Sequence, residues 1–236
     1  MVYGVILVGV VCFDFDGTLV DSYTCLPDVY RKLCQAVGLS SSQADVAVAE
    51  LMELEDLKEV EEDYRRELWW GRYFSDRWGL ELSSAELSRL HLMWFEWRTQ
   101  LTTVVDCALD VLLRLKGAGF KVYIVCGSDV IPGVKRRRVE ASGLLAATDG
   151  LYVAHEDFDG CVVDKAIELA SAHGAVPYVV DDKPRRVSKA VDRGARAILV
   201  RFTGPLKRVW CEPYPPEVTV VDRLCDVLDV VLGSGV

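Results

Sequence analysis

Two aspartates near the start of the chain, Asp14 and Asp16, stand two residues apart directly after an apolar run. If that run is a strand, the chain can turn at its end and bring both carboxylates to one site. One carboxylate can then attack a phosphorus centre and form an acyl phosphate, while the other gives a proton to the leaving group and later takes one from water. Gly17 permits the turn, and the hydroxyl of Thr18 can hold it.

Two further segments with acidic residues also follow apolar runs. They are Cys126-Gly127-Ser128-Asp129 and Asp181-Asp182-Lys183-Pro184. Ligands of open parallel sheets bind beyond the carboxyl ends of the strands, so we expect these segments to share one rim with Asp14. Carboxylates crowded in this way repel one another, and a bound divalent cation relieves the repulsion. Mg²⁺ suits the site because it takes a few carboxylates together with phosphate and water.

A phosphate that faces several carboxylates also needs a fixed cation. Lys165 stands at the start of a predicted helix that leads to the strand ending near Asp181, and we expect it to fill this role. Lys183 and Lys135 are the competing lysines.

The elements that must position these residues alternate between strand and helix after residue 103, which predicts an α/β fold with a doubly wound parallel sheet. Residues 5–15 are apolar without alternation, as is typical of a strand covered on both faces. We expect further strands over residues 121–126, 151–154, 177–180, 197–200 and 218–221. We expect helices over residues 106–118, 132–142, 164–173, 184–193 and 222–232. Residues 203–217, which contain four prolines, read as an irregular loop.

The stretch from residue 21 to residue 103 has a different character, with 16 acidic and 9 basic residues and five of the six tryptophans of the chain. It shows no strand pattern of useful length. We expect helices over residues 27–37, 42–58 and 60–78, with serines available to cap the second. A fourth helix begins at Ser83, where Glu86 completes a capping box. This stretch is predicted to be a small helical bundle, with most of its tryptophans in the bundle core.

The sequence resembles the haloacid dehalogenase (HAD) superfamily of phosphatases. Residues 13–22, FDFDGTLVDS, are close to the first motif of that family, and residues 119–127, Lys165 and Asp181-Asp182 look like the second, third and fourth motifs. The resemblance implies a Rossmann-like core over residues 1–20 and 104–236, and a cap over residues 21–103. It further implies that the cap closes over the core and selects the substrate.

The resemblance also implies roles for single residues. Asp14 would be the nucleophile and a Mg²⁺ ligand, and Asp16 the general acid and base, whose backbone carbonyl also binds Mg²⁺. Asp182 would be a metal ligand, with Asp181 beside or behind it, and Lys165 would steady the phosphoryl group. The implied phosphate-binding residues are Thr18, Cys126, Gly127, Ser128 and Lys165. Cys126 departs from the family, which has Thr or Ser there; a thiol is a weaker donor, and Ser128 is a possible substitute.

The composition excludes several classes of function. The chain has 236 residues and a net charge of −9, which disfavours binding to nucleic acid or to an anionic membrane surface. The basic run at residues 135–138 therefore reads as a solvated helix face. The N-terminal apolar run lacks a basic leader and is too short to span a bilayer, so we expect a cytoplasmic protein. None of the eight cysteines forms a CxxC pair; we expect most to be buried thiols, with no zinc site and disulfides as the minority reading.

These observations predict a magnesium-dependent phosphatase that hydrolyses a small phosphorylated metabolite, as a monomer or a homodimer. A phosphomutase would keep the same core residues and stays open as an alternative. A catalytically weak binding or regulatory protein on the same core is the alternative from another class, and Cys126 is its only support. Dehalogenases of the superfamily lack the second aspartate, so Asp16 argues against that activity.

Overall fold

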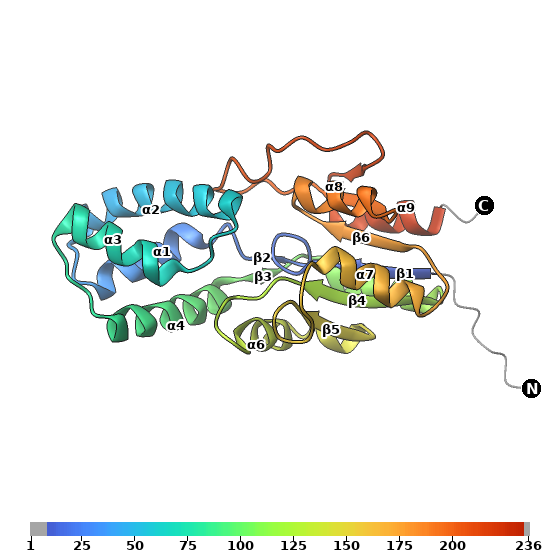
Figure 1. Cartoon of the computed structure of the whole chain (residues 1–236), viewed down its shortest axis with the longest axis horizontal. Coiled ribbons are helices and arrows are strands. Elements are labelled where there is room, and N and C mark those ends of the chain that lie inside the picture. The colour runs from blue at the N-terminus through green and yellow to red at the C-terminus, as the bar shows by residue number, and fades with distance from the viewer. Residues whose placement is uncertain (1–8, 234–236) are drawn as a thin grey trace, which may run out of the picture.

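A computed structural model describes residues 9–233, and its centre is a six-stranded parallel sheet with the strand order β5-β4-β1-β6-β7-β8 (Figure 1). The strands are β1 (Gly9–Phe13), β4 (Phe120–Cys126), β5 (Gly150–Val153), β6 (Pro177–Asp181), β7 (Arg196–Val200) and β8 (Thr219–Val221). The predicted α/β fold with a doubly wound parallel sheet is confirmed. The strand expected over residues 5–15 is β1, and residues 5–8 of that prediction lie outside the described residues.

Helices cover both faces of this sheet. On one face lie α5 (Ala108–Gly117), α6 (Val134–Ala141) and α9 (Val227–Gly233), and on the other lie α7 (Val162–Ser171) and α8 (Pro184–Asp192). Short 3₁₀ turns occupy Leu144–Ala147 and Leu224–Asp226.

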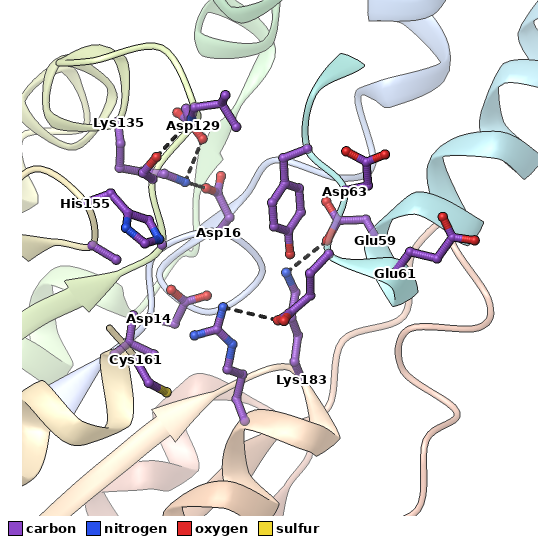
Figure 2. A pocket seen from close by; sticks show the side chains of 18 of the residues that line it. Asp14, Asp16, Glu59, Glu61, Asp63, Asp129, Lys135, His155, Cys161 and Lys183 are labelled. Carbon is purple, nitrogen blue, oxygen red and sulfur yellow. Dashed lines mark hydrogen bonds and ion pairs between the residues drawn. The ribbon is translucent and has the colours of Figure 1, made fainter. Parts of the chain in front are cut away.

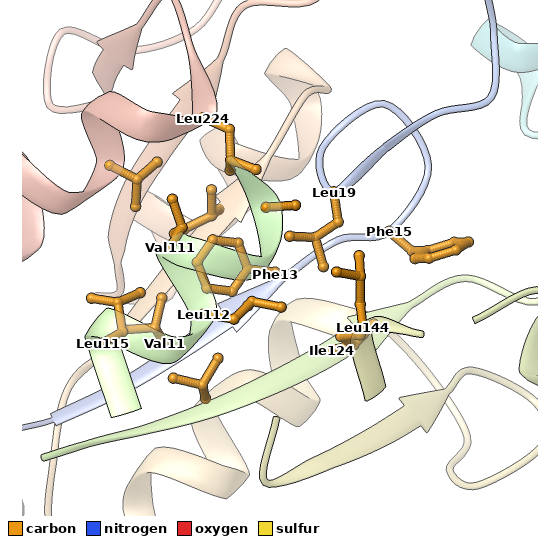
Figure 3. Packing of buried hydrophobic residues seen from close by; sticks show 14 of the residues in the cluster. Val11, Phe13, Phe15, Leu19, Val111, Leu112, Leu115, Ile124, Leu144 and Leu224 are labelled. Atoms are coloured by element: carbon orange, nitrogen blue, oxygen red, sulfur yellow. The ribbon is translucent and has the colours of Figure 1, made fainter. Parts of the chain in front are cut away.

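The central strand β1 is apolar along its whole length because both of its faces are covered. Val11 and Phe13 point into the first core, where Phe13 packs near Leu112 and Ile124 (Figure 3). Val10 and Cys12 belong to the second core, under α7 and α8. Truncation of a buried aromatic such as Phe13 to alanine typically costs about 3–5 kcal/mol.

Four helices follow β1 in the sequence and precede the other strands of the large sheet. They form a bundle at one end of the molecule (Figure 1). They are α1 (Leu26–Ala36), α2 (Ser41–Glu61), α3 (Arg66–Trp78) and α4 (Ser84–Leu101). We call residues 21–103 the helical insertion. Ser40 and Ser83 cap α2 and α4 with full capping boxes, as the sequence predicts for Ser83 and Glu86. Trp70 and Trp94 are fully buried in the bundle core, which confirms the prediction for these tryptophans.

The two chain crossings between the core and the insertion lie side by side. β2 (Val20–Asp21) pairs antiparallel with β3 (Thr103–Val104), and the Val105 N–H donates to the Leu19 carbonyl over 3.1 Å. The sequence does not predict this ladder, because two residues are too few to show an alternating pattern.

Two predicted helices differ from the observed ones. The helix expected over residues 60–78 begins only at Arg66, because Glu62 takes a left-handed conformation with φ of 55° and ends α2 there. The helix expected over residues 222–232 is divided into a 3₁₀ turn and α9. No helix within residues 9–233 has the length and apolar character needed to cross a membrane.

The proline-rich segment after β7 is irregular, as predicted, but it packs against the insertion. Leu206 and Val209 are buried in the hydrophobic cluster of the insertion. The backbone N–H of Arg208 donates to both carboxylate oxygens of Asp56 in α2, over 2.9 and 3.0 Å. This segment therefore ties the end of β7 to the helical bundle.

One pair of cysteines is covalently joined, whereas the sequence analysis favours free thiols over disulfides. Cys107 at the start of α5 forms a disulfide with Cys225, 118 residues away in the chain. Cys12, Cys25, Cys34 and Cys126 are buried free thiols, so the expectation of mostly buried thiols holds for half of the eight cysteines.

Candidate active site

The carboxyl ends of β1 and β6 bring three aspartates together. Phe13 pairs with Val180, so Asp14 and Asp181 are the next residues of two adjacent parallel strands. The Asp14 N–H continues the ladder and donates to the Val180 carbonyl over 2.9 Å. One carboxylate oxygen from each of Asp14, Asp181 and Asp182 lies within 4.8 Å of the other two.

Gly17 is required by the turn that follows these aspartates. Its φ is +81°, and its N–H donates to the Val20 carbonyl over 2.8 Å. A Cβ at this position would lie 2.5 Å from Oδ2 of Asp182 and 2.9 Å from the ring of Tyr23. The turn and the close approach of Asp182 thus both depend on the missing side chain.

Crowding and burial raise the pKa values of all three aspartates. Burial is the largest cause at each. The charge of Asp14 further raises the pKa values of Asp181 and Asp182, and the charge of Asp16 raises that of Asp14. The pKa of Asp181 rises to about 7, and that of Asp182 lies well above its ordinary value. Three carboxylates that resist ionisation together form a site where a cation is strongly favoured.

The donor set fits a hard divalent cation. All three candidate ligands are carboxylates, and Mg²⁺ prefers oxygen ligands. Oδ1 of Asp182 is buried and has no hydrogen-bond partner among residues 9–233, so this oxygen has a capacity that a metal ion would satisfy. The residues present therefore suit Mg²⁺.

Asp16 points to a separate cluster, made of acidic and basic side chains in near balance. Arg138 and Lys135 both form ion pairs with Asp16 and with Asp129, at 2.9 Å for each pair to Asp129. Arg98, from α4 of the insertion, lies 3.6 Å from Asp16. Burial alone would raise the pKa of Asp16, but these cations hold it well below its ordinary value. The ion pairs of Lys135 with Asp16 and Asp129 are drawn in Figure 2. The lowered pKa favours the ionised form of Asp16.

The basic run of α6 corrects one prediction. Lys135 and Arg138 stand three residues apart on one face of the helix and are only 6% and 3% exposed, so the solvated-face reading is wrong for them. It holds for Arg136 and Arg137, which are not buried. The i, i+3 spacing is the signal that separates the two pairs.

A cavity of about 970 Å³ lies between the core and the insertion, and Asp14 and Asp16 both line it. Eight Lys or Arg side chains and seven Asp or Glu side chains line the same cavity. The lining is therefore close to neutral, whereas the whole chain has a net charge of −9, so cations are concentrated at this cavity and are available to an anionic ligand.

Backbone strain gathers at the same cavity. Within residues 9–233, the non-glycine residues with a positive φ are Glu62, Val130 and His155, and all three line the cavity wall. Val130 is β-branched, and such a residue is rarely found in this conformation. Strain of this kind is held at functional sites by the surrounding structure.

The residues predicted to bind phosphate fall into two groups. Gly127 and Ser128 line the cavity, and the Ser128 hydroxyl accepts the Val130 N–H over 2.9 Å. Cys126 is fully buried under them, and burial raises the pKa of its thiol. Thr18 is buried, does not line the cavity, and its hydroxyl has no partner among the described residues.

Lys165 lies apart from the carboxylates. Its ammonium group pairs with Glu168 at 2.7 Å and stands over the ring of Tyr152, and the residue does not line the cavity. The two competing lysines are at the site instead. Lys135 reaches Asp16, as described, and Lys183 is a source of the positive charge that acts on Asp14.

Two further cations that no motif indicates act at the wall beside Asp14. The guanidinium of Arg186, in α8, lies 3.9 Å from where a Cβ of Gly127 would stand. Burial would lower the pKa of Arg186, but the charges of Asp181 and Asp14 raise it. Lys189, one turn further along α8, lines the cavity and has no ion-pair partner among residues 9–233. The sequence alone does not indicate Arg186 and Lys189 as site residues. They can be recognised only once the structure shows that α8 borders the cavity.

Side chains from the core also hold the insertion in place. Lys183 forms an ion pair with Glu59 of α2 at 3.0 Å, and the contact is buried on both sides (Figure 2). Arg185 donates to the carbonyls of Glu59 and Val60, over 2.5 and 2.7 Å, where α2 ends. The residue after Asp182 in the chain therefore carries a direct link to the insertion.

A protein-family model of the haloacid dehalogenase-like hydrolases matches residues 8–193. The chain belongs to this family. The match includes Asp14, Asp16 and Asp182 as well as the whole insertion. As a member of this family, the protein is a hydrolase. No curated protein matches the chain significantly.

Solved structures of the family share the fold over almost the whole chain. A predicted phosphoglycolate phosphatase from Haemophilus somnus is 14% identical, with a TM-score of 0.65, and the match covers 94% of this chain and 97% of that one. A Bacillus subtilis protein assigned as a HAD-hydrolase, YfnB, bound to magnesium, is 15% identical, with a TM-score of 0.68 and coverage of 94% and 98%. The L-2-haloacid dehalogenase of Xanthobacter autotrophicus is 18% identical, with a TM-score of 0.63 and coverage of 96% and 99%.

Proposed function

We propose that this hydrolase is a magnesium-dependent phosphatase that cleaves a small phosphorylated metabolite through an aspartyl-phosphate intermediate on Asp14. The observation that carries the proposal is the meeting of two carboxylate environments in one cavity. Asp14 shares a crowded anionic corner with Asp181 and Asp182, while Asp16 stands nearby in a cluster of cations.

Asp14 is the nucleophile in this proposal. A carboxylate oxygen of Asp14 attacks the phosphorus, the bond from phosphorus to the ester oxygen breaks, and the departing alkoxide takes a proton. The backbone N–H of Gly127 and the guanidinium of Arg186 are available to the phosphoryl oxygens on this wall of the cavity.

Asp16 moves the protons. It is ionised in the present arrangement and is therefore ready to take a proton from the water that attacks the phosphoaspartate, which releases phosphate and restores Asp14. Its earlier turn as an acid requires a weaker hold by its cations. In this proposal, arriving phosphoryl oxygens weaken the hold by competing for Lys135 and Arg138, the two cations that act most strongly on Asp16.

Lys135 and Lys183 take the role that the sequence predicts for Lys165. Both are buried cations whose charges act on Asp14, whereas Lys165 is paired with Glu168. The positive charge expected from Lys165 is thus supplied by Lys135, on the helix after β4, and by Lys183, the residue after Asp182.

Mg²⁺ is the proposed metal, held by Asp14, Asp182 and Asp181, with the backbone carbonyl of Asp16 as a further ligand. When bound, it neutralises charge on the phosphoryl oxygens and on the crowded carboxylates. The presence of magnesium in the related Bacillus subtilis structure supports this choice.

The helical insertion is the proposed cap. It contributes Arg66, Arg98 and Tyr64 to the cavity wall, opposite the strand ends of the core. Closure of such a cap excludes water and selects the substrate. The predicted phosphoglycolate phosphatase of Haemophilus somnus supports a small anionic phosphate ester as the substrate class.

The decisive test measures phosphate release from a generic aryl phosphate with and without Mg²⁺. We expect activity that requires Mg²⁺ and that falls by about 10³-fold or more in Asp14→Asn, because the amide is a poor nucleophile. Asp229→Asn, at an exposed position of α9, is the matched control and should keep full activity. Equal activity in wild type and Asp14→Asn would remove Asp14 as the nucleophile.

The same assay separates the alternatives. A phosphorylated isomer of the substrate without free phosphate would favour a phosphomutase. Mg²⁺ binding without turnover of any sugar phosphate, nucleotide or phosphoglycolate would favour a binding protein on this core.

The cytoplasm is the proposed location, on the grounds of sequence given above. The Cys107–Cys225 disulfide is unusual for that compartment, where thiols are kept reduced. Thiol labelling of the protein in cell lysates, with the oxidation state fixed at lysis, tests both points.

A further inference from the structure

One tryptophan outside every motif touches a candidate metal ligand. Trp210 lies in the irregular segment after β7, and its indole Nε1–H donates to Oδ2 of Asp182 over 2.7 Å. An indole N–H can only donate, so Trp210 cannot itself bind a metal ion. It can only act through the carboxylate that it touches.

The two oxygens of Asp182 are therefore in different states. Oδ2 is engaged by Trp210, whereas Oδ1 is buried and has no hydrogen-bond partner among residues 9–233. Asp182 is 1% exposed, so water does not satisfy the second oxygen from outside. A bond to one oxygen fixes the plane of the carboxylate and leaves the other oxygen available.

The indole ring is itself held in place by tight packing. Its ring centroid lies 4.8 Å from that of Phe202 and 5.2 Å from that of Tyr23, which it meets edge to face. A Cβ at Gly204 would come within 3.0 Å of the Trp210 side chain and 2.5 Å of the Phe202 side chain, so a larger residue there would displace one of these rings.

The next residues of the segment are anchored on the insertion. Arg208, two residues before Trp210, donates its backbone N–H to Asp56 of α2, and Val209 is fully buried in the cluster of the insertion. The indole thus packs against Phe202 and Tyr23, and the segment that carries it is anchored to the insertion through the bond from Arg208 to Asp56.

We propose that Trp210 is a positioning residue of the metal site, which orients Asp182 by the bond to Oδ2 so that Oδ1 is presented to the cation. The inference rests on the proposed magnesium site. Outer-shell partners of this kind are typically worth 10–100-fold in metal affinity, because a ligand without them turns away or must be ordered on binding.

The test is Mg²⁺ binding to the whole chain without substrate, measured by titration calorimetry. We expect Trp210→Phe, which keeps an aromatic ring against Phe202 and Tyr23, to bind Mg²⁺ about 10–100-fold more weakly. Trp78→Phe is the matched control, because Trp78 also donates its indole N–H to a side-chain oxygen, that of Tyr73, at 3.1 Å and far from the cavity. It should bind Mg²⁺ as the wild type does.

Tryptophan fluorescence gives a second readout, which reports whether the bound cation changes the surroundings of Trp210. Mg²⁺ should change the emission of the wild type and of Trp78→Phe, and the change should be lost in Trp210→Phe. If Trp210→Phe does not fold by circular dichroism, Trp210→Tyr replaces it in both measurements.

The outcomes separate this inference from the proposed function. Equal Mg²⁺ affinity in the wild type and a folded Trp210 variant overturns the positioning role alone. Absence of Mg²⁺ binding by the wild type overturns both the metal site and the role of Trp210.

Discussion

Two groups of aspartates meet at one cavity, which Asp14 lines for the first group and Asp16 and Asp129 line for the second, and the groups differ in how their charge is compensated. Asp14, Asp181 and Asp182 crowd together, and burial raises the pKa values of all three, with Asp14 adding to the rise at the other two. Asp16 and Asp129 share Arg138 and Lys135 as ion-pair partners, and their pKa values are lowered. We call the first group the open group and the second the balanced group.

The difference shows where the protein leaves room for an external cation. The balanced group brings its own cations from α6 and α4, and it is complete as it stands. The open group has carboxylate oxygens that no cation of the described residues pairs with closely. One of them, Oδ1 of Asp182, has no hydrogen-bond partner among residues 9–233. A metal ion is therefore expected at the open group, and two aspartates only two residues apart in the chain fall on opposite sides of this division.

Removal of a cation from the balanced group should have the largest effect on stability. Arg138→Met removes the cation that pairs with both Asp16 and Asp129 and leaves these buried carboxylates with Lys135 and, at 3.6 Å from Asp16, Arg98. We expect a loss of about 3–5 kcal/mol in the free energy of unfolding. Urea denaturation measures it. Arg136→Met on the same helix removes an exposed pair with Asp157 and should cost no more than about 1 kcal/mol. Similar costs for the two variants would contradict the division.

Removal of a carboxylate from the open group should act in the opposite direction. Asp182→Asn keeps an acceptor for Trp210 but relieves repulsion, so the metal-free variant should be at least as stable as the wild type. Mg²⁺ at 100 times its Kd should stabilise the wild type by about 2.7 kcal/mol and leave the variant almost unchanged. Thermal unfolding with EDTA and with Mg²⁺ checks both statements, and a variant that still responds fully to Mg²⁺ would refute them.

The pH dependence of the metal-free protein should show a smaller effect of the same origin. The pKa of Asp181 is about 7 in the folded state and near 4 when unfolded, so between these values the folded carboxyl keeps a proton that unfolding releases. Stability contributed by this group therefore falls as pH rises from about 4 to 7, by up to about 1.4 kcal/mol per pH unit.

Urea unfolding in EDTA at several pH values measures this slope. Asp181→Asn keeps an acceptor for the Lys183 N–H and should remove the contribution of Asp181 from the pH profile. A profile of the variant that is parallel to that of the wild type would show that Asp181 is ionised throughout.

Much of the fold could be predicted because its signals are local. The apolar run of β1, the glycine that follows α5 and the capping box of Ser83 and Glu86 each report their own element within a few residues. The carboxyl ends of parallel strands then meet by rule, which is why Asp14 and Asp181 could be brought together from the sequence.

The rest of the site depends on contacts between distant segments. Lys165 fits the expected order of motifs, yet its helix directs it to Glu168 and Tyr152, while Lys135 arrives from an element that the sequence presents as a charged surface. Arg98 and Trp210 reach the site from the insertion and from an irregular segment, over 82 and 28 residues of separation from Asp16 and Asp182. No local pattern encodes such approaches.

The disulfide between Cys107 and Cys225 has a topological consequence. It closes residues 107–225 into a covalent ring that contains five of the six strands, and it leaves β1 and the helical insertion outside. The strand that carries Asp14 therefore lies hydrogen-bonded between β4 and β6, two members of a ring to which it is not itself bound. When the oxidised chain unfolds, β1 and the four-helix bundle can therefore separate as a linear segment, while residues 107–225 stay closed by the disulfide.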